Sequence, residues 1–163
     1  MFTSIFEIMK KQFLYLFLLI LTMSCQEDVK FNTVSFQGVK DNVFWRAIST
    51  DATLSPSGVL TINAYTRNEI VTLKTKSKAL ATYELGKDTD NTATYQIKTN
   101  NSSTSFSTGS DFGDGQIVIT EYDNINKTIT GTFRCNVSNV DENPLYDDLI
   151  NFQQGVFYKI PVK

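Results

Sequence analysis

The chain has 163 residues, with 15 basic and 17 acidic side chains, a formal net charge of −2 and no histidine. A mildly acidic chain lacks the positive surface that nucleic-acid binding requires, so we expect no nucleic-acid partner. The lack of histidine excludes catalytic triads, proton-transfer steps and metal sites that depend on an imidazole. We expect no cofactor, no metal and no catalytic residue.

The N-terminal segment has the layout of a secretion signal. Lys10 and Lys11 precede an apolar run over residues 13–21, and the small residue Ser24 follows shortly after it. A positive start, a short apolar stretch and a small residue before the cut are typical of a cleaved leader. A membrane-spanning helix needs about 20 apolar residues, and this run has roughly half that number. We therefore predict a signal peptide over residues 1–24.

Cys25 directly follows the predicted cut, as in a bacterial lipoprotein signal. Its thiol is the expected site of lipidation, by palmitate or a similar acyl chain, so the predicted partner is a membrane reached through an N-terminal lipid. Thr22 stands where leucine is usual, so cleavage without lipidation remains an alternative. Residues 25–30 would form the lipidated cysteine and a short tether, and residues 31–163 the folded domain. Translation from Met9 rather than Met1 also remains open.

The rest of the chain alternates apolar and polar residues with the period of β-strands. Leu60, Ile62 and Ala64 share one face of a predicted strand. A short turn at residues 67–68 would close a hairpin into the apolar stretch 70–73. No helical period competes with this pattern.

The segment from residue 115 to residue 137 carries the clearest fold signal. Ile117 and Ile119 share one face of a strand, and residues 123–127 supply the bend. Alternate residues from Ile129 to Val137 share one face of the return strand. The pattern predicts an antiparallel hairpin of two long strands.

Glycine and phenylalanine recur two residues apart in this region and near the C-terminus. Gly131 precedes Phe133, and Gly155 precedes Phe157. A bare glycine lets a neighbouring ring lie across the backbone, which helps a curved sheet to pack. Cys135 falls on the same apolar face, so we expect a small core residue. If Cys25 carries lipid, Cys135 has no disulfide partner within the chain.

The whole pattern predicts about eight to ten short antiparallel strands and an all-β fold. We favour a single antiparallel β-sandwich, with an up-and-down β-barrel as the alternative. Residues 99–110 are almost entirely Asn, Ser and Thr apart from Phe106, which favours a long surface loop or a frayed hairpin anchored by that ring. We also predict a turn near residues 153–155.

Four segments carry a resemblance to a known family: 81–86, 115–123, 129–133 and 155–157. They resemble a domain-of-unknown-function family of small Bacteroidetes-type lipoproteins. The resemblance implies an all-β domain of the bacterial cell envelope, with no known activity and no catalytic residue. Glu27 and Asp28, just after Cys25, are similar to a signal for the outer membrane and for display on the cell surface.

Several features of the sequence could carry chemistry. Carboxylate pairs occur at four places: Asp88/Asp90, Glu121/Asp123, Asp141/Glu142 and Asp147/Asp148. A glycosidase holds two carboxylates roughly 5 to 10 Å apart across a cleft, whereas acidic residues in turns more often cap the backbone. The segment 110–115 is interpreted as a glycine-rich approach to a hairpin. Trp45, with the tyrosines, would suit sugar stacking, but a strand tryptophan is more often a core residue.

These observations favour a non-enzymatic, membrane-anchored envelope lipoprotein that serves as an interaction or ligand-binding module, with a protein or glycan partner. The alternatives are a carboxylate-dependent glycan hydrolase of the cell surface and a structural subunit of an envelope complex. A groove with two converging carboxylates would favour the hydrolase. A shallow exposed aromatic patch would favour binding, and a long unpaired edge strand would favour assembly.

Overall fold

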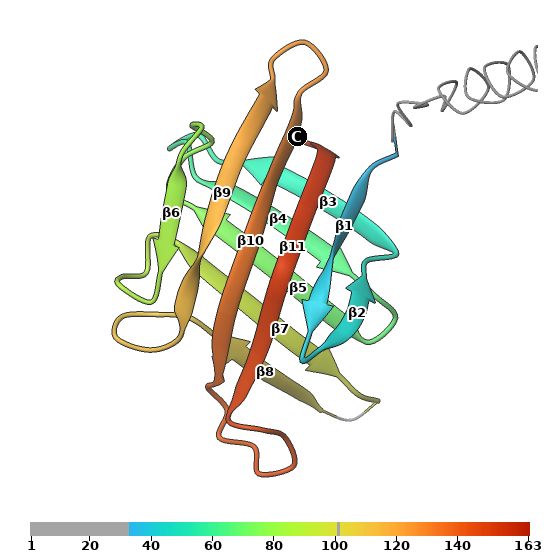
Figure 1. Cartoon of the computed structure of the whole chain (residues 1–163), viewed down its shortest axis with the longest axis vertical. Helices are drawn as coiled ribbons and strands as arrows, with labels where there is room; N and C mark the ends of the chain where they lie inside the picture. Colours follow the sequence, from blue (N-terminus) through green and yellow to red (C-terminus); the bar gives the residue numbers. More distant parts are fainter. Residues whose placement is uncertain (1–32, 101) are drawn as a thin grey trace, which may run out of the picture. The chain divides into compact units, whose positions relative to one another are not determined.

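A computed structural model describes residues 33–100 and 102–163 (Figure 1). The predicted signal peptide and Cys25 lie outside the described residues. Within the described ranges no helix has the length and apolar character needed to cross a membrane.

The described residues form eleven strands, drawn as arrows in Figure 1. In chain order they are β1 (Ser35–Lys40), β2 (Val43–Arg46), β3 (Ser49–Leu54), β4 (Leu60–Tyr65), β5 (Glu69–Thr75), β6 (Thr82–Leu85), β7 (Thr92–Lys98), β8 (Ser103–Ser107), β9 (Asp114–Asp123), β10 (Thr128–Asn139) and β11 (Leu149–Pro161).

All strands belong to one strongly curled sheet whose named strand pairs are antiparallel. Nine strands run in the order β2-β1-β11-β10-β8-β7-β5-β4-β3, while β9 pairs with β10 and β6 pairs with β9. In Figure 1 the strands β1, β9, β10 and β11 lie in front of β3, β4, β5 and β7 and cross them. The residues that follow β11 contact β3, the last strand of this order: Lys163 N donates to the Ala52 carbonyl at 2.9 Å.

The curl creates a core between the front and back strands. Along β5, for example, Val71 and Leu73 are buried, while Ile70 and Thr72 face outward. Burial of a large apolar side chain contributes about 1.5 to 3 kcal/mol, so the inward residues supply the main stabilisation. The largest fully buried side chains are Tyr95, Phe36, Phe106, Phe152, Phe157, Leu60, Ile62, Leu73, Ile117, Ile119, Ile129 and Ile160.

Two glycines on β10 and β11 each lie beneath a phenylalanine ring of the opposite strand. Gly131 is paired with Phe157, and Phe133 is paired with Gly155. A methyl group added at Gly155 would overlap the Phe133 ring, and one added at Gly131 would overlap the Phe157 ring. The predicted packing of aromatic rings over bare backbone is therefore confirmed, and it is reciprocal.

The predicted all-β fold is confirmed for the described residues. The two faces of the predicted sandwich are the front and back parts of one curled sheet. The hairpin turn at residues 67–68 joins β4 to β5, and the bend at residues 123–127 joins β9 to β10, both as predicted.

Of two predictions about irregular segments, one was wrong and the other was right in one of its alternatives. The segment 99–110 is not a surface loop but the hairpin that was the other alternative: it contains the strand β8, which pairs with β7, and Thr104 and Phe106 face the core. The serines on its outward face hid this alternation. No turn breaks the chain near residues 153–155, because β11 continues through a β-bulge in which Gln154 takes a φ of 51°. A bulge at a left-handed residue resembles a turn in sequence.

Substitution of Gly155 by alanine should lower the free energy of unfolding by about 1 to 3 kcal/mol, because the new methyl group overpacks the Phe133 ring. Chemical denaturation measures this loss. The double variant Gly155→Ala/Phe133→Leu should lose less than the sum of the two single variants, since the smaller side chain leaves room for the methyl group. Additive losses would show that the ring does not restrict Gly155.

Candidate functional site

Cys135, the second cysteine, lies in the core as predicted. Its side chain is buried within β10, with only 3% of its surface exposed. Burial, followed by the nearby Asp114 carboxylate, raises the pKa of the Cys135 thiol to about 12. The thiol is therefore protonated and shielded at neutral pH, and it behaves as a small apolar side chain.

Two of the acidic residues considered as carriers of chemistry cap turns. Asp88 Oδ1 accepts hydrogen bonds from the backbone N–H groups of Asp90 and Asn91, at 2.9 and 3.4 Å. Asp123 Oδ1 accepts the backbone N–H of Asn126 at 2.9 Å. Hydrogen bonds from the Asn126 backbone and side chain lower the pKa of the Asp123 carboxyl. Each of these two carboxylates therefore stabilises its own turn.

The segment 110–115 approaches β9 through a turn, as interpreted from sequence. Gly109 and Phe112 form an isolated bridge across it, and Asp111 and Gly113 both have a positive φ. Across residues 33–100 and 102–163, no cluster of three acidic, cysteine or histidine side chains is placed to hold a metal ion.

Trp45 is a core residue, with 5% of its surface exposed. Its ring meets the Phe36 and Phe152 rings edge-on, both with centroids 6.0 Å apart. The indole N–H of Trp45 donates to Glu69 Oε2 at 2.6 Å. The predicted core position is thus correct, and the ring also takes part in a polar network that sequence reasoning missed.

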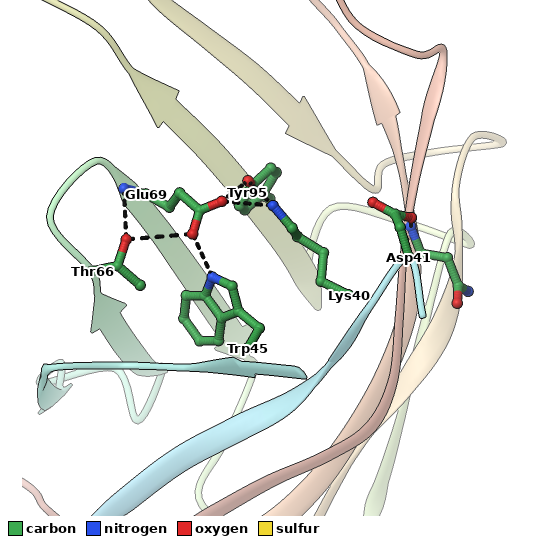
Figure 2. A network of polar contacts seen from close by, with 7 residues as sticks. Lys40, Asp41, Trp45, Thr66, Glu69 and Tyr95 are labelled. Carbon is green, nitrogen blue, oxygen red and sulfur yellow. Dashed lines mark hydrogen bonds and ion pairs between the residues drawn. The ribbon is translucent and has the colours of Figure 1, made fainter. Parts of the chain in front are cut away.

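The Glu69 network joins strands of the front and back parts of the sheet around one carboxylate (Figure 2). Lys40 Nζ donates to Glu69 Oε1 at 2.6 Å, and the Tyr95 hydroxyl donates to the same oxygen. Oε2 accepts from Trp45 and, at 3.4 Å, from the Thr66 hydroxyl. Lys40 comes from β1, Trp45 from β2, Glu69 from β5 and Tyr95 from β7.

At neutral pH the Glu69 carboxyl of this network is ionised and the Tyr95 phenol is protonated. Burial alone would raise the pKa of Glu69, but hydrogen bonds from Lys40, Tyr95 and Trp45 outweigh it and lower that pKa below its usual value. Burial and the Glu69 carboxylate together raise the pKa of the Tyr95 phenol. An ionised acid beside a protonated phenol is not poised to exchange a proton near pH 7. The geometry is that of an ion pair that ties strands together.

A signal for this network exists in the sequence. Glu69 shares the inward register of Val71 and Leu73, so an acidic residue stands where the alternation requires an apolar one. An inward carboxylate must find partners, but only the fold shows that Lys40 and Tyr95 reach it.

The outer surface of the back strands carries two rows of side chains across β3, β4, β5, β7 and β8. Row 1 follows the strand register through Asp51, Asn63, Thr72, Thr94 and Ser107. Row 2 follows it through Ser49, Tyr65, Ile70, Gln96 and Ser105. The middle of both rows, from β4 to β8, is hollowed into a depression of about 450 Å³. We call this depression the outer groove.

Hydrogen bonds along row 1 hold its side chains in place. Thr72 Oγ1 donates to Asn63 Oδ1 at 2.9 Å, and Asn63 Nδ2 donates to Asp51 Oδ1 at 3.0 Å. In row 2, Gln96 Nε2 donates to Ser105 Oγ at 3.4 Å. The lining is therefore uncharged, rich in hydroxyl and amide groups, and partly ordered before any ligand arrives.

The described residues thus form an all-β domain with a half-buried carboxylate network and an uncharged groove on its outer surface. The chain belongs to the family described as Domain of unknown function (DUF6252), whose model matches residues 32–161. The expected resemblance to a family of unknown function is confirmed at this level. Searches of curated proteins and of solved structures found no significant match.

Replacement of Glu69 by glutamine should lower the free energy of unfolding by about 2 to 3 kcal/mol at pH 7, because hydrogen bonds to a charged group are lost. The folded-state pKa of Glu69 is lowered, so its contribution is complete above its unfolded pKa and disappears as pH falls through the folded pKa. The difference from the wild type should therefore shrink in acid. Denaturation series at several pH values measure this, with the exposed Glu121→Gln as the matched control.

Cys135 should react slowly with a thiol reagent in the native protein and rapidly in denaturant, since the folded core hides the thiol. A Cys25→Ala background leaves Cys135 as the one cysteine in the sequence, so the colour released by the reagent reports on it alone. Cys135→Ala should cost about 1 to 3 kcal/mol of stability through the small void it leaves. Fast native reaction would mean that the side chain points outward.

Proposed function

We propose that the chain is a non-enzymatic lipoprotein of the bacterial cell envelope, anchored through Cys25, that serves as an interaction or ligand-binding module. The observation that carries the binding role is the outer groove. Its volume of about 450 Å³ lies within the range of small-molecule sites, and partly exposed hydroxyl and amide groups line it. Such groups recognise a ligand by hydrogen bonding without reacting with it.

The placement in the envelope rests on the leader. Lys10, Lys11 and the apolar run that follows favour export, and Cys25 stands at the position of a lipidated cysteine. One acyl chain gives only reversible membrane binding, whereas several give a lasting anchor. Glu27 and Asp28 support placement in the outer membrane, with display on the surface as the corresponding hypothesis. The domain would then work within a short distance of its bilayer.

A second candidate, a structural subunit of an envelope complex, is favoured by strand β2. This strand lies at one end of the sheet order and is paired with β1 alone among the described strands. Val43 and Phe44 on this strand and Ile48 just beyond it expose 65%, 65% and 79% of their surface. Exposed apolar residues beside a free edge suit the addition of a strand from another protein.

Cells that express the wild-type chain should incorporate labelled palmitate into it, because the mature N-terminal cysteine would be acylated. Cys25→Ala should abolish the label and release the protein from the membrane fraction. Autoradiography of the immunoprecipitated protein measures both forms.

The matched control is Cys135→Ala, which removes the other thiol and should keep full labelling and membrane association. Normal labelling of the Cys25→Ala variant, or a freely soluble wild type, would refute the anchor.

A further inference from the structure

We propose that the outer groove binds an uncharged saccharide chain. This inference rests on the proposed role as a binding module and names its ligand class. Four observations lead to it: the charge of the groove, the pairing of its strands, the chemistry of its side chains and their spacing.

The charge of the groove argues against an ionic ligand. Rows 1 and 2 contain no cation, and their one carboxylate, Asp51, lies at the end of row 1 and already accepts a hydrogen bond from Asn63. A second carboxylate, Asp141, lies beside Ser105 and is also engaged, because it accepts the Ser105 backbone N–H at 2.7 Å. The nearest cations on the same strands, Lys74 and Lys98, lie in the neighbouring rows, where Lys74 is paired with Thr92 and Lys98 with Ser103. A charged ligand would lose hydration in the groove without gaining a counter-charge, whereas a neutral ligand avoids that cost.

The pairing of the strands argues against a peptide that adds to the sheet. The groove is lined by β4, β5, β7 and β8 together with Val140, and its two central strands, β5 and β7, are each paired on both sides. Their backbone N–H and C=O groups are used within the sheet, so a peptide could not bind here by strand addition. Recognition must come from side chains, as it does for a sugar.

The side chains of the groove match the groups of a sugar ring. Hydroxyls and amides, such as those of Thr94 and Gln96, offer both donors and acceptors, as sugar hydroxyls require. Thr72 donates to Asn63, which leaves the Thr72 oxygen as an acceptor for an incoming hydroxyl. Tyr65 adds a ring and Ile70 an apolar surface, and both are half-buried beside these polar groups. Such surfaces suit the C–H face of a sugar.

The spacing of the groove favours a chain over a single sugar. Neighbouring strands lie about 4.8 Å apart, so row 1 repeats polar groups at regular steps across β4, β5, β7 and β8, while row 2 places the apolar Ile70 between Tyr65 and Gln96. The rows also run side by side along the strand register. A ligand made of repeated hydroxyl-bearing units can meet successive strands with the same kind of contact. The internal hydrogen bonds of row 1 reduce the ordering that binding requires.

The test uses the purified full chain in detergent on an array of neutral saccharides (dextran, mannan, galactan, xylan and mixed-linkage β-glucan) and anionic ones (polygalacturonate and chondroitin sulfate). Titration with the best ligand then compares variants. Thr94→Ala should weaken binding about two- to tenfold, the effect of one lost hydrogen bond. Thr92→Ala is the matched control, because it makes the same change on the same outward face of β7 but outside the groove, and it should bind as the wild type does.

Binding to a neutral saccharide that Thr94→Ala weakens and Thr92→Ala preserves supports the inference. Binding to anionic saccharides alone, no binding to the array, or equal binding by the two variants overturns it. A photo-crosslinking residue at position 94 distinguishes failure of the saccharide inference from failure of the proposed binding role. If a protein is captured there and no saccharide binds, the binding role stands and the saccharide inference is overturned. Absence of palmitate labelling in the wild type would refute the anchor and leave the groove result untouched.

Discussion

The packing of two phenylalanine rings onto two glycines is the contact on which the curl of this sheet depends. Gly131 faces Phe157 and Gly155 faces Phe133 across the pair β10 and β11, so each ring occupies the space that a side chain would have filled. The β-bulge at Gln154 allows β11 to bend beside these contacts. Because β10 and β11 lie near the middle of the strand order, their curvature brings β1 and β9 opposite the strands of the back. In the resulting core the Phe133 ring packs against both the Phe36 ring and the Phe152 ring.

The Glu69 network follows from the same curvature. A curled sheet brings the end of β1 to the start of β5, so the side chains of Lys40 and Glu69, at these two strand ends, meet there. Lys40, Tyr95 and Trp45 supply the donors that a half-buried carboxylate needs, so the charge is kept without an unsatisfied group. The Trp45 ring packs in the core while its N–H reaches Glu69. One side chain therefore links the apolar and polar parts of the interior.

The outer groove is a different product of the fold, because it lies on the side of the sheet that the core does not use. A regular flat sheet would present its Thr, Ser, Asn and Gln side chains as an ordinary solvated face. Here the central strands are hollowed between β4 and β8, and the hydroxyl and amide groups are half-buried around an uncharged depression. Stability comes from the inward register, whereas the proposed saccharide binding would use the outward one. The two functions can therefore vary independently along the same strands.

Sequence patterns were enough to predict the all-β class, the hairpins at residues 67–68 and 123–127, the core positions of Trp45 and Cys135, and the packing of rings on glycines. These features depend on local spacing, since alternation and turn residues act between neighbours in the chain. Three other features emerge only from the folded chain: the regular pairing of β8, the continuation of β11 through a bulge, and the meeting of Lys40, Glu69 and Tyr95. The strand register also places Thr72 beside Thr94 and Tyr65 beside Ile70 in the outer groove. Strand order and register are set by long-range packing, and no local pattern in one sequence specifies which distant strands become neighbours.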